Sequence, residues 1–186
     1  MFKIPVVIQH RHVHVSPEDQ AALFGEGTTL TPVRSLEHRE QVVYRETVDL
    51  VGKAGRLERV RILGPARAQT QVEISASEAF ALGIDAPVRV SGDLKRSGNG
   101  ELVGPHGKVK VRSRVIIPAR HIHCSASDAK KLGMKHEQLV SVKTADGSTI
   151  EHITLRVHPT FRPAFHLTAD EAAEYWLHTG DHVTFA

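Results

Sequence analysis

The chain of 186 residues contains one cysteine, few aromatic residues and no long apolar run. Cys124 therefore cannot form an internal disulfide bond, which suits a reducing cytosol. Because no stretch is long enough to span a membrane and no secretory signal follows Met1, we expect a cytoplasmic protein without a membrane partner. Aromatic residues make up only 5% of the chain and its net charge is +3, which argues against nucleic acid as a partner.

Histidine, in contrast, occurs 13 times, and two histidine pairs share one motif. Arg11-His12-Val13-His14 follows a β-branched run at residues 4–8, and Arg120-His121-Ile122-His123 follows a similar run at residues 115–119. Such runs predict buried strands, and a strand places alternate side chains on the same face. Both imidazoles of each pair should therefore face the same way. Because neutral imidazole is a common zinc ligand, the repeated motif predicts a metal-binding protein.

A second pattern occurs four times along the chain. A potential metal ligand stands two residues before a Ser or Thr, and an acidic residue follows three positions after that hydroxyl. This is the spacing of an N-terminal capping box, so a short helix should begin at each hydroxyl. The same unit of strand, ligand, cap and short helix thus occurs four times. Because the ligands stand at equivalent strand ends, residues from distant parts of the sequence can lie together in one site. The ligands of the four units are His14, Glu73, His123 and His166.

The candidate ligands exceed the needs of one tetrahedral zinc with an open position, and they suit two metal ions that keep places for water or substrate. Glu73 could be a solvated strand carboxylate or, as the repeat favours, a metal ligand, either to one ion or as a bridge between two. Cys124 should face away from the histidines and belong to the core. Arg67 lies six residues before Glu73 and could hold a phosphate or carboxylate in a bidentate manner. The ligand set is His12, His14, Glu73, His121, His123 and His166.

The two halves of the chain repeat one another. Residues 75–83 closely match residues 125–133, and each segment precedes a strand-like run. Many short strands with a few helical turns predict a mainly β fold with short helices: two similar small β-barrels capped by short α-helices, with a pseudo-twofold internal repeat. We expect one barrel domain at residues 1–118 and a second at residues 119–186. The sequence leaves open whether the first strand pairs into the other barrel.

Together these motifs resemble one family, the PduL-type phosphate acyltransferases (phosphate propanoyltransferases). The likeness extends from about Ile4 to about Ala173, nearly the whole chain. Departures occur at Cys124, at Ala173, where Asn is common, and at Gln9-His10, and they leave the CoA contacts and the acyl preference open. The matching segments are residues 11–16, 60–67, 70–75, 87–93 and 120–123, with His166 and residues 170–172.

The resemblance implies two β-barrel domains with a di-zinc site between them. It implies interconversion of a short-chain acyl-CoA (propionyl-CoA or acetyl-CoA) and phosphate with acyl phosphate and coenzyme A. The N-terminal extension that directs some members into bacterial microcompartments is absent, so this member is expected in the cytosol unless the extension has been removed. A homo-oligomer is compatible with the family.

The resemblance also assigns roles to single residues. One zinc, near the CoA sulfur, would be held by His12, His14 and Glu73, and the other by His121, His123 and His166. Arg67 would bind phosphate, and Arg34, Arg61 and Leu63 would lie along CoA.

The residues and the resemblance suggest direct attack of phosphate on the thioester in a ternary complex, without a protein nucleophile. Two alternatives use the same ligands. In a di-metal thioesterase or phosphoesterase, a metal-bound hydroxide would replace phosphate as the nucleophile. In a metal-stabilised binding module, metal would bind without turnover.

Overall fold

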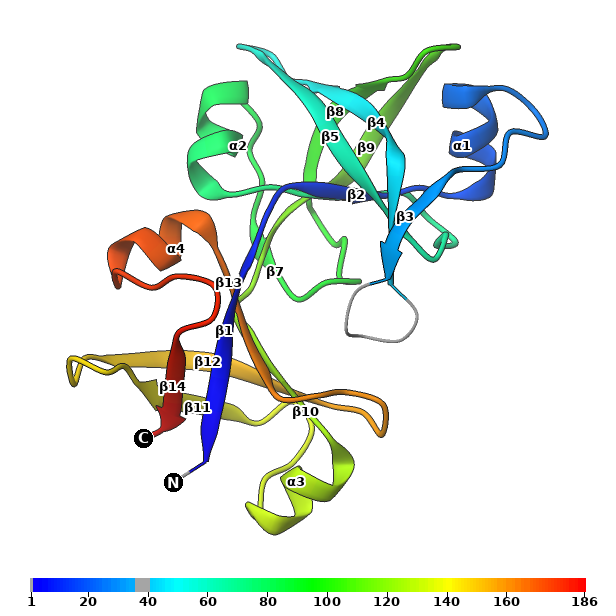
Figure 1. Ribbon diagram of the computed structural model, residues 1–186. Coiled ribbons are helices and arrows are strands. Elements are labelled where there is room, and N and C mark those ends of the chain that lie inside the picture. The colour runs from blue at the N-terminus through cyan, green and yellow to red at the C-terminus, as the bar shows by residue number, and fades with distance from the viewer. Residues whose placement is uncertain (1, 36–40) are drawn as a thin grey trace. The chain divides into compact units, whose positions relative to one another are not determined.

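The computed structural model describes residues 2–35 and 41–186. Contacts between Cα atoms divide the chain into two compact units. One unit is Arg11–Pro118, and the other, here called the terminal unit, joins the segment up to His10 to Ala119–Ala186. Each unit is a β structure with two short helices among the described residues (Figure 1).

The Arg11–Pro118 unit contains a closed ring of strands in the order β4, β5, β2, β6, β9 and β8. The ring closes because β8 pairs with both β9 and β4. Strand β3 extends the sheet beside β4, and β7 pairs with β9. Helices α1 and α2 lie on opposite sides of this barrel (Figure 1). The elements are β2 (His12–His14), α1 (Pro17–Phe24), β3 (Pro32–Ser35), β4 (Val42–Val51), β5 (Arg56–Gly64), β6 (Gln71–Glu73), α2 (Ala76–Leu82), β7 (Val88–Arg89), β8 (Gly98–Val103) and β9 (Lys108–Pro118).

The terminal unit forms a second closed barrel, with the strand order β1, β13, β10, β12, β11 and β14. The two ends of the chain meet in it, because β1 pairs antiparallel with β14 (Figure 1). The elements are β1 (Lys3–Gln9), β10 (His121–Cys124), α3 (Ala126–Lys131), β11 (Leu139–Lys143), β12 (Thr149–Val157), β13 (Ala164–Thr168), α4 (Ala169–Glu174) and β14 (His182–Phe185). The mainly β fold with two similar barrels is thereby confirmed.

The two barrels share one pattern of strand pairing. Starting at β9 in one ring and at β1 in the other, the pairs run parallel, antiparallel, parallel and then antiparallel three times. In chain order, β1 precedes β2 just as β9 precedes β10. Each of these leading strands completes the ring of the other repeat. The fold is therefore an internal duplication whose copies exchange their first strands.

The helix starts follow the capping pattern of the sequence. Each of the four capping hydroxyls accepts a hydrogen bond from the backbone N–H three residues later. In α2 and α4 the acidic side chain also accepts a bond from the backbone N–H of the capping residue, which completes the capping box. Each cap lies at or within two residues of the end of a barrel strand. The capping residues are Ser16, Ser75, Ser125 and Thr168.

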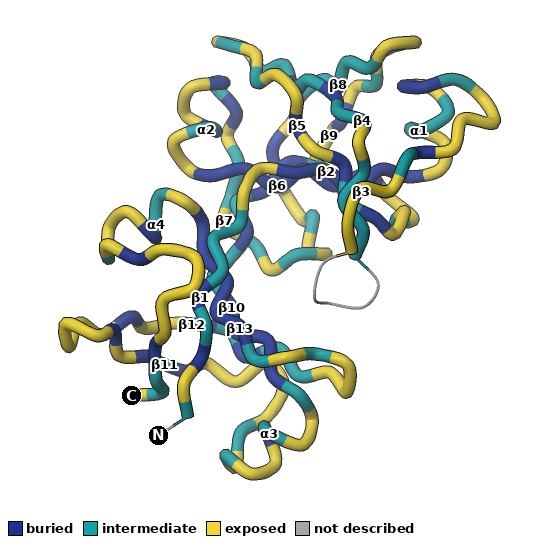
Figure 2. The backbone as a smooth tube through the Cα atoms, in the orientation of Figure 1, coloured by how far each residue is buried: buried dark blue, intermediate teal, exposed yellow. Residues whose placement is uncertain are grey.

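The core of each unit is formed by apolar residues of its barrel strands and of the helices packed against them. The buried segments are dark blue in Figure 2. Val13 and Val72 are fully buried in one barrel, and they alternate with the polar residues of the same strands. Ile122 and Phe165 have the same place in the other. Cys124 also lies in that core, on the same side of β10 as Ile122, and burial raises the pKa of its thiol. The histidines of β2 and β10 therefore face away from the barrel interiors.

Two turns pack tightly against helix ends. The backbone at Gly52 would place an added Cβ 2.1 Å from the carbonyl oxygen of Leu82, at the end of α2. A Cβ added at Gly104 would be 2.4 Å from the carbonyl oxygen of Leu23, in α1. Only glycine allows backbones to approach this closely. The similar sequences at residues 50–55 and 102–107 therefore serve the same packing in both places.

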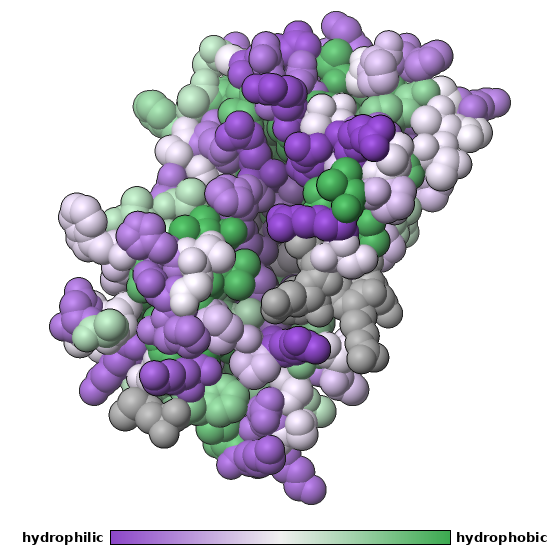
Figure 3. Space-filling model, viewed as in Figure 1, coloured by the Kyte–Doolittle hydropathy of each residue, from purple (hydrophilic) through white to green (hydrophobic). Residues whose placement is uncertain are grey.

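In the described residues, no helix is long and apolar enough to cross a membrane. Hydrophilic side chains cover most of the visible surface of each unit, and hydrophobic ones form small patches (Figure 3).

Candidate metal centres

The first ligand cluster lies on neighbouring strands of the Arg11–Pro118 unit. His12 and His14 come from β2, and Glu73 comes from β6. His12 is directly opposite Glu73 in the antiparallel register, and its Nε2 lies 3.5 Å from Glu73 Oε2. One donor atom from each residue lies within 4.8 Å of the other two, and all three residues are buried. The arrangement can therefore offer three ligand atoms to one ion.

His14 has the chemistry expected of a metal ligand. Its Nδ1 is buried and has no hydrogen-bond partner in the described part of the chain. Burial, and then the nearby His12 and Arg67, lower the pKa of His14 to about 3, so the ring is neutral and keeps an electron pair. The carboxylate of Glu73 and the backbone carbonyl of Leu63 act against this lowering of the pKa but do not outweigh it.

Glu73 is held as a carboxylate by its surroundings. Burial by itself would raise the pKa of Glu73, but His12, a hydrogen bond from Ser91, His14 and Arg67 together lower it. Ser91 Oγ donates to Glu73 Oε1 over 2.7 Å, and Gln71 Nε2 donates to the same oxygen. Sequence reasoning missed both donors. The alternation of Gln71 with Glu73 on one strand face was the only available signal for Gln71.

Arg67 lies beside this cluster. Its backbone N–H donates to Val15 O over 3.1 Å, which ties the loop after β5 to the end of β2. Its Nη1 donates to Ser91 Oγ over 3.2 Å, so one hydroxyl group connects the guanidinium with the Glu73 carboxylate. Arg67 therefore places a positive charge near the ligands.

The second ligand cluster is in the terminal unit. His121 and His123 come from β10, and His166 comes from β13. The ring centroids of His121 and His166 are 5.0 Å apart, and those of His123 and His166 are 4.5 Å apart. As in the first cluster, one donor atom of each lies within 4.8 Å of the others, and all three are buried.

Contacts around the second cluster fix two of its rings. His121 Nδ1 lies 2.9 Å from the carbonyl oxygen of Ala119, which sets Nδ1 as the donor and fixes the orientation of the ring. The ring of Phe161 stacks on His123 with 4.0 Å between centroids and 22° between planes. Phe161 comes from the loop between β12 and β13, and no sequence signal indicated it.

The two clusters occupy equivalent places in equivalent barrels. His12 pairs with Glu73 on β2 and β6 just as His121 pairs with His166 on β10 and β13. Glu73 thus takes the place that His166 has in the other barrel. One donor set is two imidazoles with a carboxylate, and the other is three imidazoles, so the sets differ by one negative charge.

The residues expected along CoA lie on the sheet beside the first cluster. Arg61 pairs with His12 in register, and its Nη1 donates to the carbonyl oxygen of Arg45 over 2.9 Å. Leu63 lies two residues further on β5 and pairs with Val43, which pairs with Arg34 on β3. Arg34, Val43 and Leu63 therefore form one row of residues that are paired across three neighbouring strands. Arg61 and His12 belong to the next row on the same side of β5.

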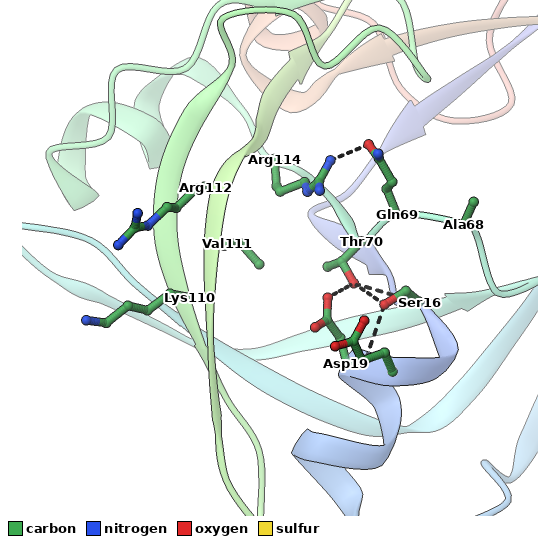
Figure 4. A pocket seen from close by; sticks show the side chains of 10 residues that line it. Ser16, Asp19, Ala68, Gln69, Thr70, Lys110, Val111, Arg112 and Arg114 are labelled. Atoms are coloured by element: carbon green, nitrogen blue, oxygen red, sulfur yellow. Dashed lines mark hydrogen bonds between the residues drawn. The ribbon is translucent and has the colours of Figure 1, made fainter.

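A surface pocket of about 240 Å³ in the Arg11–Pro118 unit contains none of the six ligands (Figure 4). Some of its polar groups bond to one another: Thr70 contacts Asp19 and Ser16, and Arg114 contacts Gln69 (Figure 4). Among the described residues, the groups of three or more side chains that could hold a metal ion are the two buried clusters, and neither lines this pocket.

Comparison with known proteins gives a consistent result. The profile of the phosphate propanoyltransferase family matches residues 5–178. A phosphate propanoyltransferase of Thermotoga maritima is 44% identical over 181 residues, which are 96% of this chain and 86% of that protein. Those of Rhodobacter capsulatus and Salmonella typhimurium are 38% and 40% identical, over 94% and 91% of this chain and 82% and 81% of those proteins. The chain belongs to the phosphate propanoyltransferase family and is an acyltransferase.

Proposed function

We propose that the chain interconverts a short-chain acyl-CoA, propionyl-CoA or acetyl-CoA, and phosphate with acyl phosphate and CoA, using two zinc ions. The observation that carries the proposal is the pair of buried ligand clusters at equivalent places in two barrels, with a cationic side chain beside one of them. The names of the relatives support the same reaction.

The residues fit zinc. His14 presents a buried nitrogen without a hydrogen-bond partner in the described residues, and the carbonyl of Ala119 orients the ring of His121. We assign His12, His14 and Glu73 to the ion near the CoA sulfur, and His121, His123 and His166 to the other. Bound zinc would supply Lewis-acid chemistry, which polarises the thioester carbonyl and stabilises the CoA thiolate.

The charge difference between the donor sets suits two different ligands. The set with Glu73 neutralises part of the charge of a divalent ion, whereas the set with three neutral imidazoles leaves all of it. The histidine set therefore favours an anionic ligand more strongly. Two unlike sets in otherwise equivalent barrels are consistent with a reaction that handles a thioester and a phosphate together.

Arg67 is assigned to phosphate binding, because a guanidinium matches two phosphate oxygens with two N–H groups. It would hold phosphate so that one oxygen attacks the thioester carbonyl carbon. The new C–O bond forms, the C–S bond breaks, and CoA leaves as a thiolate that is then protonated. The one cysteine of the chain does not serve as a nucleophile in this scheme, because Cys124 is only 1% exposed and faces the barrel core.

Arg61, Leu63 and Arg34 are assigned to CoA. They occupy two adjacent rows on the face formed by β3, β4 and β5, and the row of Arg61 contains His12. A CoA molecule along this face would bring its sulfur end toward the first cluster. Assembly into a homo-oligomer and association with a bacterial microcompartment stay predictions.

The variant Arg67→Ala tests the phosphate assignment. A hydrogen bond to a charged group contributes about 1.5–3 kcal/mol, so the KM for phosphate should rise roughly tenfold to a hundredfold. The KM for acyl-CoA and the zinc content should stay at the wild-type values. Arg112→Ala, which removes an exposed arginine of β9, is the matched control. Loss of zinc in Arg67→Ala would instead show that Arg67 has a structural role.

A further inference from the structure

Ser91 lies at the centre of a hydrogen-bond network that the assignments above do not use. Its Oγ lies 2.7 Å from Glu73 Oε1, 3.0 Å from Gln71 Nε2 and 3.2 Å from Arg67 Nη1. A hydroxyl has one proton to donate and two lone pairs to accept with. The amide nitrogen of Gln71 and the guanidinium of Arg67 can only donate, so the Ser91 proton must go to the carboxylate of Glu73. The three contacts use the full capacity of the hydroxyl.

A tight turn presents Ser91 to these groups. The N–H of Asp93 donates to Val90 O over 2.9 Å, and Gly92 has a φ of 103°, which favours glycine. The N–H of Gly92 donates to Gln71 Oε1 over 2.9 Å. This bond fixes the orientation of the Gln71 amide, so its nitrogen faces Glu73 and Ser91.

The network distinguishes the two oxygens of Glu73. Oε1 accepts bonds from Ser91 and Gln71, whereas Oε2 lies toward Nε2 of His12. Groups that hydrogen-bond one oxygen of a ligating carboxylate orient the other toward the metal. The same hydroxyl stands between the carboxylate and Arg67. Because this hydroxyl accepts a hydrogen bond from Arg67 Nη1, it also fixes the position of the guanidinium.

We propose that Ser91 is a positioning residue that orients Glu73 for metal binding and Arg67 for phosphate binding. The proposal rests on the proposed function for the phosphate part, but its metal part depends only on the ligand cluster. Ser91 thereby links two functions of one unit: the geometry of the metal ligands and the geometry of the anion-binding arginine.

The test uses Ser91→Ala on the full chain, freed of metal and titrated with zinc against a chromophoric chelator. Removal of a group that orients a metal ligand typically weakens binding 10–100-fold. We expect this loss at one of two zinc sites, together with a higher KM for phosphate and an unchanged KM for acyl-CoA. Ser141→Ala, the same substitution on β11 of the terminal unit, should behave like the wild type.

Ser91→Thr and Ser91→Val provide a second pair of nearly equal shape that differs by the hydroxyl. Thr should restore zinc affinity and the phosphate KM, and Val should not. Wild-type zinc affinity in Ser91→Ala, or equal behaviour of the folded Thr and Val variants, would overturn the proposal. If the wild type binds two zinc ions but forms no acyl phosphate, the proposed function fails, while the zinc titration still decides the role of Ser91.

Discussion

Because the two ligand clusters lie in separate barrels with separate cores, zinc binding to each should be removable on its own. The substitutions are His14→Ala and His123→Ala, which each delete one of three protein ligands. The wild type should bind two equivalents of zinc, and each variant should bind one. His182→Ala, at an exposed position of β14, is the control for loss of an imidazole elsewhere.

The expected magnitude follows from binding linkage. At free zinc 100 times above the dissociation constant, one site adds about 2.7 kcal/mol to the free energy of unfolding. For domains of 60–100 residues each kcal/mol corresponds to about 4–8 °C in Tm, so one site should contribute on the order of 10–20 °C. Each variant should keep the zinc-dependent stabilisation of one barrel and lose that of the other.

The assay is zinc content by atomic emission at fixed free zinc, with calorimetry in the presence and absence of zinc. Each variant is compared with and without zinc, so a change in the stability of the metal-free chain does not affect the result. If one substitution removes both equivalents, the clusters do not act as separate centres. If neither removes any, the histidines are not ligands and the reasoning from the clusters is refuted.

Three further predictions follow from single positions. Gly52→Ala would place its Cβ against the carbonyl of Leu82 and should lower the free energy of unfolding, measured in urea, by about 1–3 kcal/mol. Lys53→Ala at the exposed neighbouring position is the control and should change it little; equal stability of the two variants would contradict the close packing. Cys124→Ser buries a hydroxyl in the core and should lower the free energy of unfolding by about 1–3 kcal/mol. The rate of acyl transfer per folded molecule should stay unchanged, and its loss would indicate a covalent thioester at Cys124. Glu73→His reproduces the donor set of the other barrel and should bind two equivalents of zinc, whereas Glu73→Leu should bind one. Zinc content is measured by atomic emission, and equal zinc in both variants would exclude Glu73 as a ligand.

Much of the fold could be predicted from the sequence because its signals are local. The alternation around His12 and His121 indicates strands, and the hydroxyl–acid spacing marks helix starts that the structure reproduces at all four places. The repeat marks Glu73 as a candidate ligand, and the family resemblance groups it with His12 and His14; the structure brings these three side chains together.

The remainder depends on contacts between distant segments. Ser91 and Phe161 come from loops, where no periodicity marks a side chain that faces the cluster. The exchange of β1 and β9 could not be derived either. Both strands contain a β-branched apolar run shortly before the same motif, so the local sequence does not say which barrel each strand joins.

The central claim is most directly tested by measuring free CoA thiol released from propionyl-CoA and acetyl-CoA, with and without phosphate, on protein of known zinc content. The account predicts release that requires phosphate, yields one acyl phosphate per CoA and stops on chelation of the metal. Release at the same rate without phosphate would identify a hydrolase and contradict the account.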